Sequence, residues 1–452
     1  MNTSSRSSLH NHQPVTDELG RDVPQLKSYS KSLKGSLGSL YNLNQRQLLG
    51  SNSALAEWNY VMSQSNNGSS AAPSVVDRAS VSGYSYATKK TARGGAYREP
   101  TFQGVFRPKF IKREASEVYC VKFSPDDEFI AAGLGNSFIQ IYSTSNSENV
   151  RTLVAPSELE KELYPCTSIA FRPDCGGYKN KNVLVAGYAD GRIIHWHYTS
   201  GQLISTVPEP NVQINCVTYQ SNLNSETAGA YFASSGSDSY VRVYDSQNHK
   251  KLLEMNRGQG DISAGHSSRV FSVRFHPTEQ NILISGGWDN TIQFWDTRIG
   301  HSVRSIYGPH ICGSDSLDFN QDGSEILTAS FAKEDQLQMW DFGSGKLIDT
   351  IAWSIMEGER KNSLLYSGSF GKSKAPGGGV QYAIAGGCGG FNEVKLFNLQ
   401  TKRAVGVAQG FTHSVYSVVM SSNEKMIAVG GGFKAVYAYD VDMHQQTSEL
   451  IY

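Results

Sequence analysis

The sequence predicts an all-β protein built from seven copies of one unit. Between residues 118 and 420 a six-residue alternating segment recurs seven times, and the last residues of successive copies are 48, 48, 56, 44, 51 and 50 positions apart. Alternation of apolar and polar residues is the period of a strand with one buried face. The 44 glycines, 23 tyrosines and 19 phenylalanines also favour short strands joined by tight turns.

Residues 1–101 differ from the rest and form a predicted flexible, basic tail. The first 100 residues contain 19 serines and carry 11 basic against 6 acidic side chains, a net charge of +5. Such a composition cannot bury enough apolar surface to offset the entropy of an ordered backbone. The stretch 53–62 fits a short helix that docks on a partner, although a transient turn without a role fits it equally well. Its apolar face would consist of Leu55, Trp58 and Met62.

Bulk composition favours a soluble cytoplasmic protein. The 41 basic and 41 acidic residues cancel, so no net field attracts nucleic acid or an anionic membrane. The six cysteines contain no CxxC pair, which favours reduced thiols in the cytosol. The first residues lack an apolar leader, and no apolar run approaches membrane-spanning length. We therefore expect neither secretion nor membrane insertion.

The first half of each unit is an alternating strand whose third residue is always cysteine or serine. These seven strands cover residues 118–123, 166–171, 214–219, 270–275, 314–319, 365–370 and 415–420. A position that holds only small side chains lies where a neighbouring backbone approaches closely. The pattern therefore assigns Cys120 and Cys216 to the core rather than to a ligand site.

The second half of each unit is a patch of small residues followed by a strand that ends in an aromatic side chain. The aromatic residues are Tyr142, Trp196, Tyr244, Trp295, Trp340, Phe397 and Tyr439. Aspartate follows directly in four copies, and a weaker strand such as 201–207 or 345–351 separates one unit from the next. Self-similarity at this period is typical of repeat architectures.

The seven-fold period, together with two kinds of dipeptide, makes residues 106–452 resemble the WD-repeat family. The dipeptides are Gly265-His266, Trp295-Asp296 and Trp340-Asp341. The resemblance implies that residues 102–452 form a seven-bladed β-propeller, whose four-stranded antiparallel blades surround a central channel. It also implies a structural hydrogen-bonded tetrad of His266, Ser285, Asp289 and Trp295. Where tyrosine or phenylalanine replaces the tryptophan, we expect the blade to rely on packing alone.

A closed ring of blades needs one strand from the other end of the chain. The segment 106–112 lies at the right distance before the first unit to become the outer strand of the last blade. The segment 447–452 resembles the other fourth strands and is the alternative. We favour the N-terminal segment, because closure protects the sheet edges.

No pattern in the sequence supports an enzyme, a cofactor or a metal site. His195 and His197 share one face of a strand, but no further cysteine or histidine pair stands at ligand spacing. Glycines 377–379 lack the Gly-Lys-Ser/Thr and the helix of a phosphate-binding loop. We therefore expect no catalytic residues, no cofactor and no small-molecule substrate.

The turns between the second and third strands are predicted to form a rim that binds other proteins. Large apolar side chains recur there, at Leu134, Tyr188, Trp288, Phe331 and Phe433. The residues that precede first strands reach the same face, at Glu117, Gln213 and Arg269. Such clustering predicts a contact surface, and in similar proteins such as G-protein β subunits these positions hold partner peptides. The alternative is that the rings pack on each other or lie under the chain's own tail.

Three functions fit these features. The first is a general scaffold or adaptor that uses the rim and the tail. The second is a substrate receptor of a cullin–RING ubiquitin ligase, because 295–298 resembles the WDxR box that engages the ligase's adaptor, with Arg298 as its key residue. The third is a part of a ciliary, centriolar or other microtubule assembly, where the basic tail would meet acidic tubulin. Nucleic acid is a weaker choice, since no basic stripe with aromatic residues appears on the units.

Overall fold

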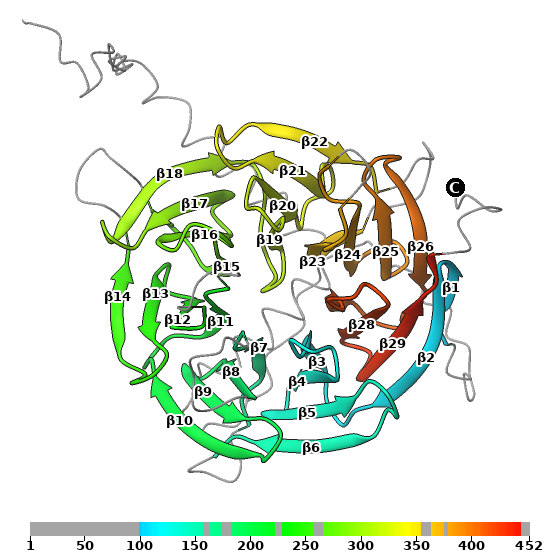
Figure 1. Ribbon diagram of the computed structural model, residues 1–452, viewed down its shortest axis with the longest axis horizontal. Helices are drawn as coiled ribbons and strands as arrows, with labels where there is room; N and C mark the ends of the chain where they lie inside the picture. The colour runs from blue at the N-terminus through cyan, green and yellow to red at the C-terminus, as the bar shows by residue number, and fades with distance from the viewer. Residues whose placement is uncertain are drawn as a thin grey trace, which may run out of the picture. The chain divides into compact units, whose positions relative to one another are not determined.

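The folded part of the chain is a ring of seven sheets. The computed structural model describes residues 99–156, 163–173, 182–221, 228–256, 265–353, 363–374 and 378–443. The sheets are antiparallel and stand radially around one axis (Figure 1). The predicted all-β, seven-bladed propeller is therefore confirmed. The predicted helix 53–62, with its three docking side chains, and the segment 447–452 lie outside the described residues.

Each blade runs from an innermost strand beside the channel to an outermost strand. Blade 1 contains β3 (Val118–Phe123), β4 (Phe129–Leu134), β5 (Phe138–Ser143) and β6 (Asn149–Val154), and blade 2 contains β7 (Cys166–Phe171), β8 (Val183–Tyr188), β9 (Arg192–His197) and β10 (Gln202–Pro208). Blade 3 contains β11 (Ile214–Tyr219), β12 (Tyr231–Gly236), β13 (Val241–Asp245) and β14 (Lys251–Met255), and blade 4 contains β15 (Val270–Phe275), β16 (Ile282–Gly287), β17 (Thr291–Asp296) and β18 (His301–Tyr307). Blade 5 contains β19 (Leu317–Phe319), β20 (Glu325–Ala329), β21 (Leu337–Asp341) and β22 (Leu347–Ile351). Blade 6 contains β23 (Leu364–Phe370), β24 (Tyr382–Cys388), β25 (Glu393–Asn398), β26 (Arg403–Gln409) and β1 (Thr101–Gly104). Blade 7 contains β27 (Val415–Met420), β28 (Met426–Gly431), β29 (Ala435–Val441) and β2 (Phe106–Arg113).

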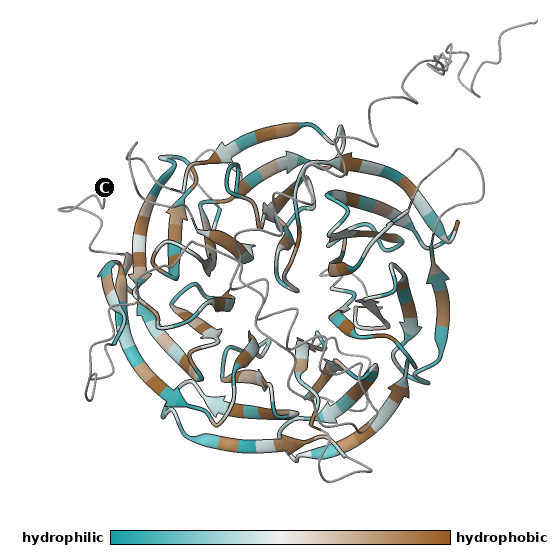
Figure 2. Cartoon of the chain, turned by 180° about the vertical axis from the view of Figure 1, so that it is seen from behind, coloured by the Kyte–Doolittle hydropathy of each residue, from teal (hydrophilic) through white to brown (hydrophobic). Residues whose placement is uncertain are grey.

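Burial decreases from the inner strands to the outermost strand of a blade. All of β8 is buried, whereas Leu153 is the single buried residue of β6. Apolar residues gather on the inner strands in Figure 2, whereas apolar and polar residues alternate along the outermost strands. Inner strands are covered on both faces by neighbouring blades, while outermost strands meet water. The hydrophobic core is thus distributed between the blades.

The small third residues of the innermost strands hydrogen-bond one blade to the next. The hydroxyl of Ser168 accepts a hydrogen bond from the backbone N–H of Val217 in the following blade, at 3.1 Å. Ser417 does the same across the junction between blades 7 and 1, also at 3.1 Å. Cys120 and Cys216 are completely buried at equivalent positions, as predicted. The close approach of strands is therefore present, and the hydroxyl adds a bond that the pattern did not reveal.

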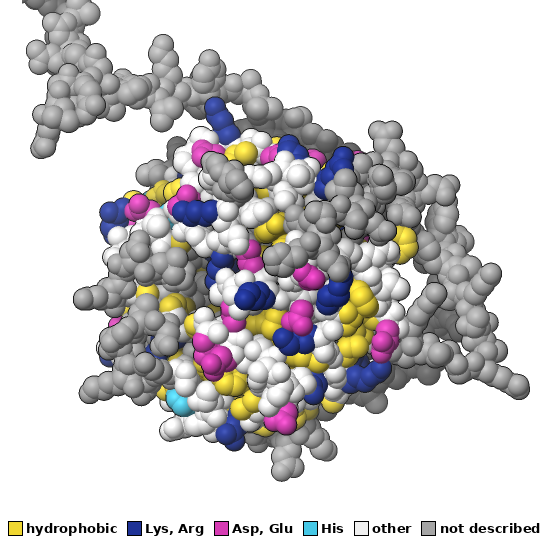
Figure 3. All heavy atoms as spheres, turned by 45° about the vertical axis from the view of Figure 1, so that its right-hand side comes forward, with side chains coloured by type: hydrophobic (Ala, Val, Ile, Leu, Met, Phe, Trp, Pro, Cys, Tyr) yellow, Lys and Arg dark blue, Asp and Glu magenta, His cyan; other side chains and the backbone are white. Residues whose placement is uncertain are grey.

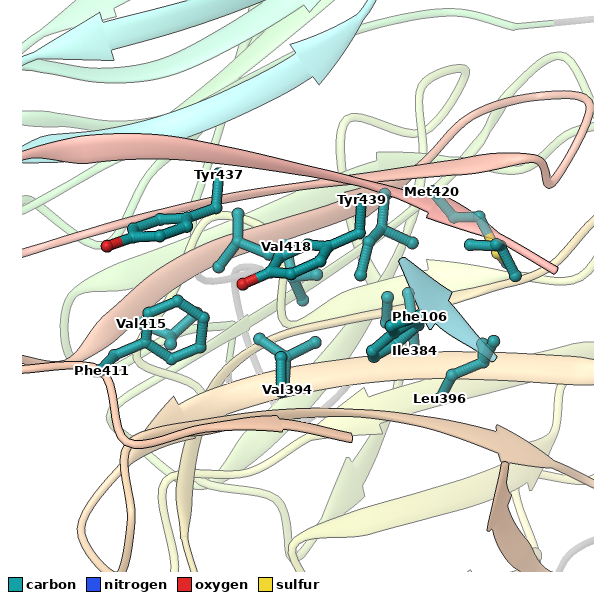
Figure 4. Packing of buried hydrophobic residues seen from close by; sticks show 14 of the residues in the cluster. Phe106, Ile384, Val394, Leu396, Phe411, Val415, Val418, Met420, Tyr437 and Tyr439 are labelled. Carbon is teal, nitrogen blue, oxygen red and sulfur yellow. The ribbon is translucent and has the colours of Figure 1, made fainter. Parts of the chain in front are cut away.

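The N-terminal segment closes the ring. Strand β2 pairs antiparallel with β29, from Phe106 opposite Val441 to Arg113 opposite Ala435. The prediction that this segment supplies the outer strand of blade 7 is therefore confirmed. Phe106 is completely buried in a core that blades 6 and 7 share (Figure 4). The closure thus combines a hydrogen-bonded ladder with apolar packing.

Strand β1 extends this closure to a second blade and was not predicted. It pairs with β26 and becomes a fifth strand of blade 6. Gly104 has a φ of 71°, a conformation that glycine adopts without steric cost. The chain turns there from the edge of blade 6 to the edge of blade 7. Residues 101–113 therefore hold two neighbouring blades together.

Candidate partner-binding face

The predicted tetrad residues of blade 4 lie within hydrogen-bond distance of one another. Nε1 of Trp295 donates to Oγ of Ser285 at 2.7 Å, and this Oγ lies 2.6 Å from Nε2 of His266. Nδ1 of the same histidine lies 2.8 Å from Oδ2 of Asp289. The series runs from strand β17 through β16 to the turns at the face of the propeller. Its side chains are buried, which fits a structural role.

Replacing Ser285 by alanine is expected to lower the free energy of unfolding by about 1–3 kcal/mol, because two buried polar groups lose their partner. Urea denaturation followed by tryptophan fluorescence measures the loss. Ser145→Ala is the matched control, since this hydroxyl lies on an exposed turn. Equal midpoints for the two variants would contradict the structural role of the tetrad.

Blades 1 and 3, which lack the tryptophan, do not rely on packing alone, and this corrects our expectation for these two blades. In blade 1 the hydroxyl of Tyr142 donates to the carboxylate of Glu114. In blade 3 the hydroxyl of Tyr244 lies 3.0 Å from Oγ of Ser234 and donates to Glu209 at 3.0 Å. A phenol O–H therefore replaces the indole N–H, and a carboxylate accepts its hydrogen bond. The tyrosine at this position resembles tryptophan in size, and its hydroxyl adds a polar function that size does not reveal.

Most of the predicted rim is not an exposed contact surface. Leu134, Tyr188, Phe331 and Phe433 are 1%, 0%, 3% and 6% exposed, and the expectation that they face a partner is wrong. The ring of Phe331 packs against that of Tyr366, with ring centroids 4.8 Å apart. Phe433 stacks on Phe411 with ring centroids 4.9 Å apart. Turn residues on a propeller can point inward over the core, and the sequence pattern does not distinguish this from exposure.

Trp288 and Arg269, in contrast, are only partly buried. The guanidinium of Arg269 lies 5.6 Å from the centroid of the Trp288 ring, and that ring stacks on Phe271 at 5.2 Å. The backbone N–H of Trp288 donates to the carbonyl of Arg269 at 3.0 Å. A Cβ added at Gly287 would lie 2.2 Å from that carbonyl oxygen, so glycine permits the contact. The turn and the residue before β15 therefore form one unit.

The remaining two predicted face residues have partners within the protein. Gln213 is 3% exposed, and its Oε1 accepts a hydrogen bond from Nη1 of Arg269 at 3.0 Å. Glu117 is partly buried and forms an ion pair with Lys434 at 3.2 Å. Gln213 thus joins the Arg269–Trp288 pair, whereas Glu117 belongs to another part of the face.

A charged cluster in the central channel was missed by sequence reasoning. The carboxylate of Asp315 pairs with Lys122 of blade 1 and, at 2.8 Å, with Arg274 of blade 4. It also accepts a hydrogen bond from Ser417 of blade 7 at 3.1 Å. We define these four residues as the channel clasp. Burial by itself would raise the pKa of Asp315, but Lys122 and Arg274 hold that pKa below its ordinary value.

The clasp explains why the innermost strand of blade 5 is shorter than predicted. The sequence pattern covers 314–319, but β19 contains only Leu317–Phe319. The residues before it leave the sheet, and Asp315 forms an isolated bridge with Ser367 of blade 6. A Cβ at Gly313 would lie 1.8 Å from the carbonyl oxygen of Tyr366, so only glycine lets the chain pass.

The two histidines considered as metal ligands do not form a joint site. His195 is buried, with its Nδ1 3.2 Å from the hydroxyl of Ser205, and burial lowers its pKa to about 3. His197 instead approaches Ser200 on a turn, at 2.7 Å. The described residues contain no group of three side chains suited to holding a metal ion. They also include no helix long and apolar enough to cross a membrane.

Arg298 lies at the surface beside blade 4. Its side chain is 68% exposed and forms a bidentate contact with Asp296, with N–O distances of 3.0 and 2.6 Å. The guanidinium is therefore accessible but already paired. Its role as a ligase-adaptor contact stays a prediction.

Comparison with known proteins gives the same picture as the fold. A family model described as WD domain, G-beta repeat matches residues 108–143 and 261–296. "Cell division cycle 20.1, cofactor of APC complex" of Arabidopsis thaliana is 25% identical over 240 residues, which are 52% of this chain and 47% of that protein. "WD repeat-containing protein slp1" of Schizosaccharomyces pombe is 25% identical over 243 residues, 53% of this chain and 43% of that protein. "Coronin-like protein crn1" of the same yeast is 32% identical over 111 residues, 24% of this chain and 18% of that protein.

These similarities and the geometry define the class: a seven-bladed β-propeller with a hydrogen-bonded tetrad in blade 4. A WD-repeat family model thus matches two segments of the chain, in agreement with the seven-bladed propeller that the resemblance implied. The matched region spans less than half the length of the relatives named above.

Proposed function

We propose that this protein is a non-enzymatic adaptor that holds partner proteins on the turn face of its propeller. The observation that carries the proposal is the Arg269–Trp288 pair. A large aromatic ring and a guanidinium, both partly exposed on a rigid turn, are the residue types that dominate binding energy at interfaces. The buried polar clusters of the described residues, in contrast, join strands and blades.

The relatives support the same kind of role. Two of them carry names that describe a cofactor of a complex or a WD-repeat protein, which fits a protein that acts through its partners. On the side shown in Figure 3, basic and acidic side chains intermingle without a patch of one sign. Recognition on that side would therefore depend on local shape and pairing rather than on a broad field.

Affinity capture from cells with the Trp288→Ala variant tests the proposal. We expect the variant to lose partner proteins that the unchanged protein retains, because the ring is the largest accessible contact on the turn. Tyr307→Ala is the matched control: Tyr307 is 74% exposed on the outermost strand of the same blade. Thermal unfolding of both variants shows that each is folded. An identical set of partners for Trp288→Ala and the unchanged protein would refute this role of the face.

Each of the two narrower functions makes a specific prediction about the residues that it would use. Contact with a cullin–RING adaptor would use Arg298, whose accessible guanidinium is compatible with it. Binding to microtubules would use the basic tail 1–101, most of which lies outside the described residues. The Arg269–Trp288 pair favours the general adaptor over both narrower functions. The adaptor function requires neither a contact through Arg298 nor the basic tail.

A further inference from the structure

Arg269 differs from Arg192 and Arg242 in its partners. Arg192 pairs with Asp190, and Arg242 pairs with Asp238, Glu209 and Glu254. Within the part of the chain that the structure describes, Arg269 has no ion pair with a carboxylate. Its one hydrogen-bond acceptor is the neutral amide oxygen of Gln213.

The carboxylate nearest in sequence to Trp288 has partners other than this guanidinium. Asp289 accepts from the backbone N–H of Ser267 at 2.9 Å and from Oγ1 of Thr291 at 2.9 Å, in addition to its contact with His266. Both of its oxygen atoms therefore already accept hydrogen bonds from the tetrad and the residues beside it. Partial burial lowers the pKa of Arg269.

The surroundings hold the guanidinium in one place. Gln213 fixes one edge through Nη1, and the Trp288 ring lies beneath the planar group. Because the Trp288 ring stacks on the Phe271 ring, its movement is restricted. A guanidinium carries five N–H donors in a rigid fork, which matches the two oxygens of a carboxylate or a phosphate.

We infer that Arg269, Gln213 and Trp288 form a site for an oxyanion carried by an extended partner peptide. The site rests on the proposed adaptor function and specifies the chemistry of its partner. The anion neutralises a partly desolvated cation that has no counter-ion among the described residues, and the indole ring takes an adjoining apolar part of the peptide. A carboxylate and a phosphoryl group share this chemistry, and the experiment distinguishes them.

The test uses the full-length protein and fluorescence anisotropy with pools of short labelled peptides. The peptides have amidated C-termini and non-acidic flanks, and their central residue is glutamate, glutamine, phosphoserine or serine. Because a hydrogen bond to a charged group contributes about 1.5–3 kcal/mol, we expect an anionic pool to bind roughly tenfold or more tightly than its neutral counterpart. Whichever of the glutamate and phosphoserine pools binds more tightly identifies the source of the oxyanion.

Arg269→Gln is expected to abolish this difference, whereas Arg403→Gln, which removes an exposed arginine of β26, is expected to preserve it. Equal binding of charged and neutral pools to the unchanged protein would overturn the inference, as would an undiminished difference in a folded Arg269→Gln variant. Absence of binding to every pool would also overturn it. If Trp288→Ala loses its cellular partners while Arg269→Gln keeps them, the oxyanion site is refuted and the adaptor function stands.

Discussion

Asp315→Ala is expected to lower the free energy of unfolding by about 3–5 kcal/mol, the cost of leaving a buried charge without its partner. Asp315 is 5% exposed and is bound by Lys122, Arg274 and Ser417. These partners belong to blades 1, 4 and 7, whereas Asp315 precedes the innermost strand of blade 5. Its removal leaves two cations close together in the channel and disconnects strands from four blades. Urea denaturation measures the loss.

Asp349→Ala is the matched control for this substitution. Asp349 pairs with Lys402, whose side chain is 56% exposed, and an ion pair of this kind contributes about 1 kcal/mol or less. If the two alanine variants unfold at the same urea concentration, the channel clasp does not stabilise the ring.

The contribution of the clasp is also expected to depend on pH. The pKa of Asp315 is lowered from 3.8, because the two cations outweigh the effect of burial. A carboxyl group with a lowered pKa stabilises the folded state above its unfolded pKa of about 3.9 and loses this effect as the pH falls through the lowered value. The stability difference between the unchanged protein and Asp315→Asn should therefore be constant near neutral pH and shrink below about pH 4. A difference that grows on acidification would contradict this assignment.

Phe106→Ala should destabilise the propeller by about 3–5 kcal/mol, the usual cost of deleting a buried phenylalanine ring. Phe106 is completely buried on the closing strand, between side chains of blades 6 and 7 that include Ile384 and Tyr439. A Cβ at Gly406 would lie 2.9 Å from its ring, so the neighbouring chain fits closely against it. The variant loses contact area at the junction where the N-terminal strand β2 meets blades 6 and 7.

Phe102→Ala provides a control of the same residue type four positions earlier. Phe102 is 41% exposed on β1, so its truncation removes little buried surface. We expect its urea midpoint to stay near that of the unchanged protein, while that of Phe106→Ala falls. Limited proteolysis should also cut the Phe106→Ala protein faster, since an open ring exposes strand edges. Equal effects of the two substitutions would show that the closure does not depend on the buried ring.

The repeated strands, the closing segment and the blade 4 tetrad were predictable because their signals are local. A strand with one buried face alternates along the chain, and each copy of the unit repeats the same packing problem. His266, Ser285, Asp289 and Trp295 fall at fixed places within one copy, so their proximity follows once the unit is recognised. The segment before Val118 could likewise be assigned because a closed ring leaves one outer strand missing.

The direction of the rim side chains and the channel clasp could not be predicted in this way. An aromatic residue in a turn can fold inward, as Phe433 does, or remain accessible, as Trp288 does, and both choices look alike in the sequence. Asp315 and Lys122 are 193 residues apart along the chain, and they meet only because the ring brings its innermost strands around one channel. Periodicity reports which face of a strand is buried, whereas exposure and long-range pairing depend on what the closed ring places opposite each side chain.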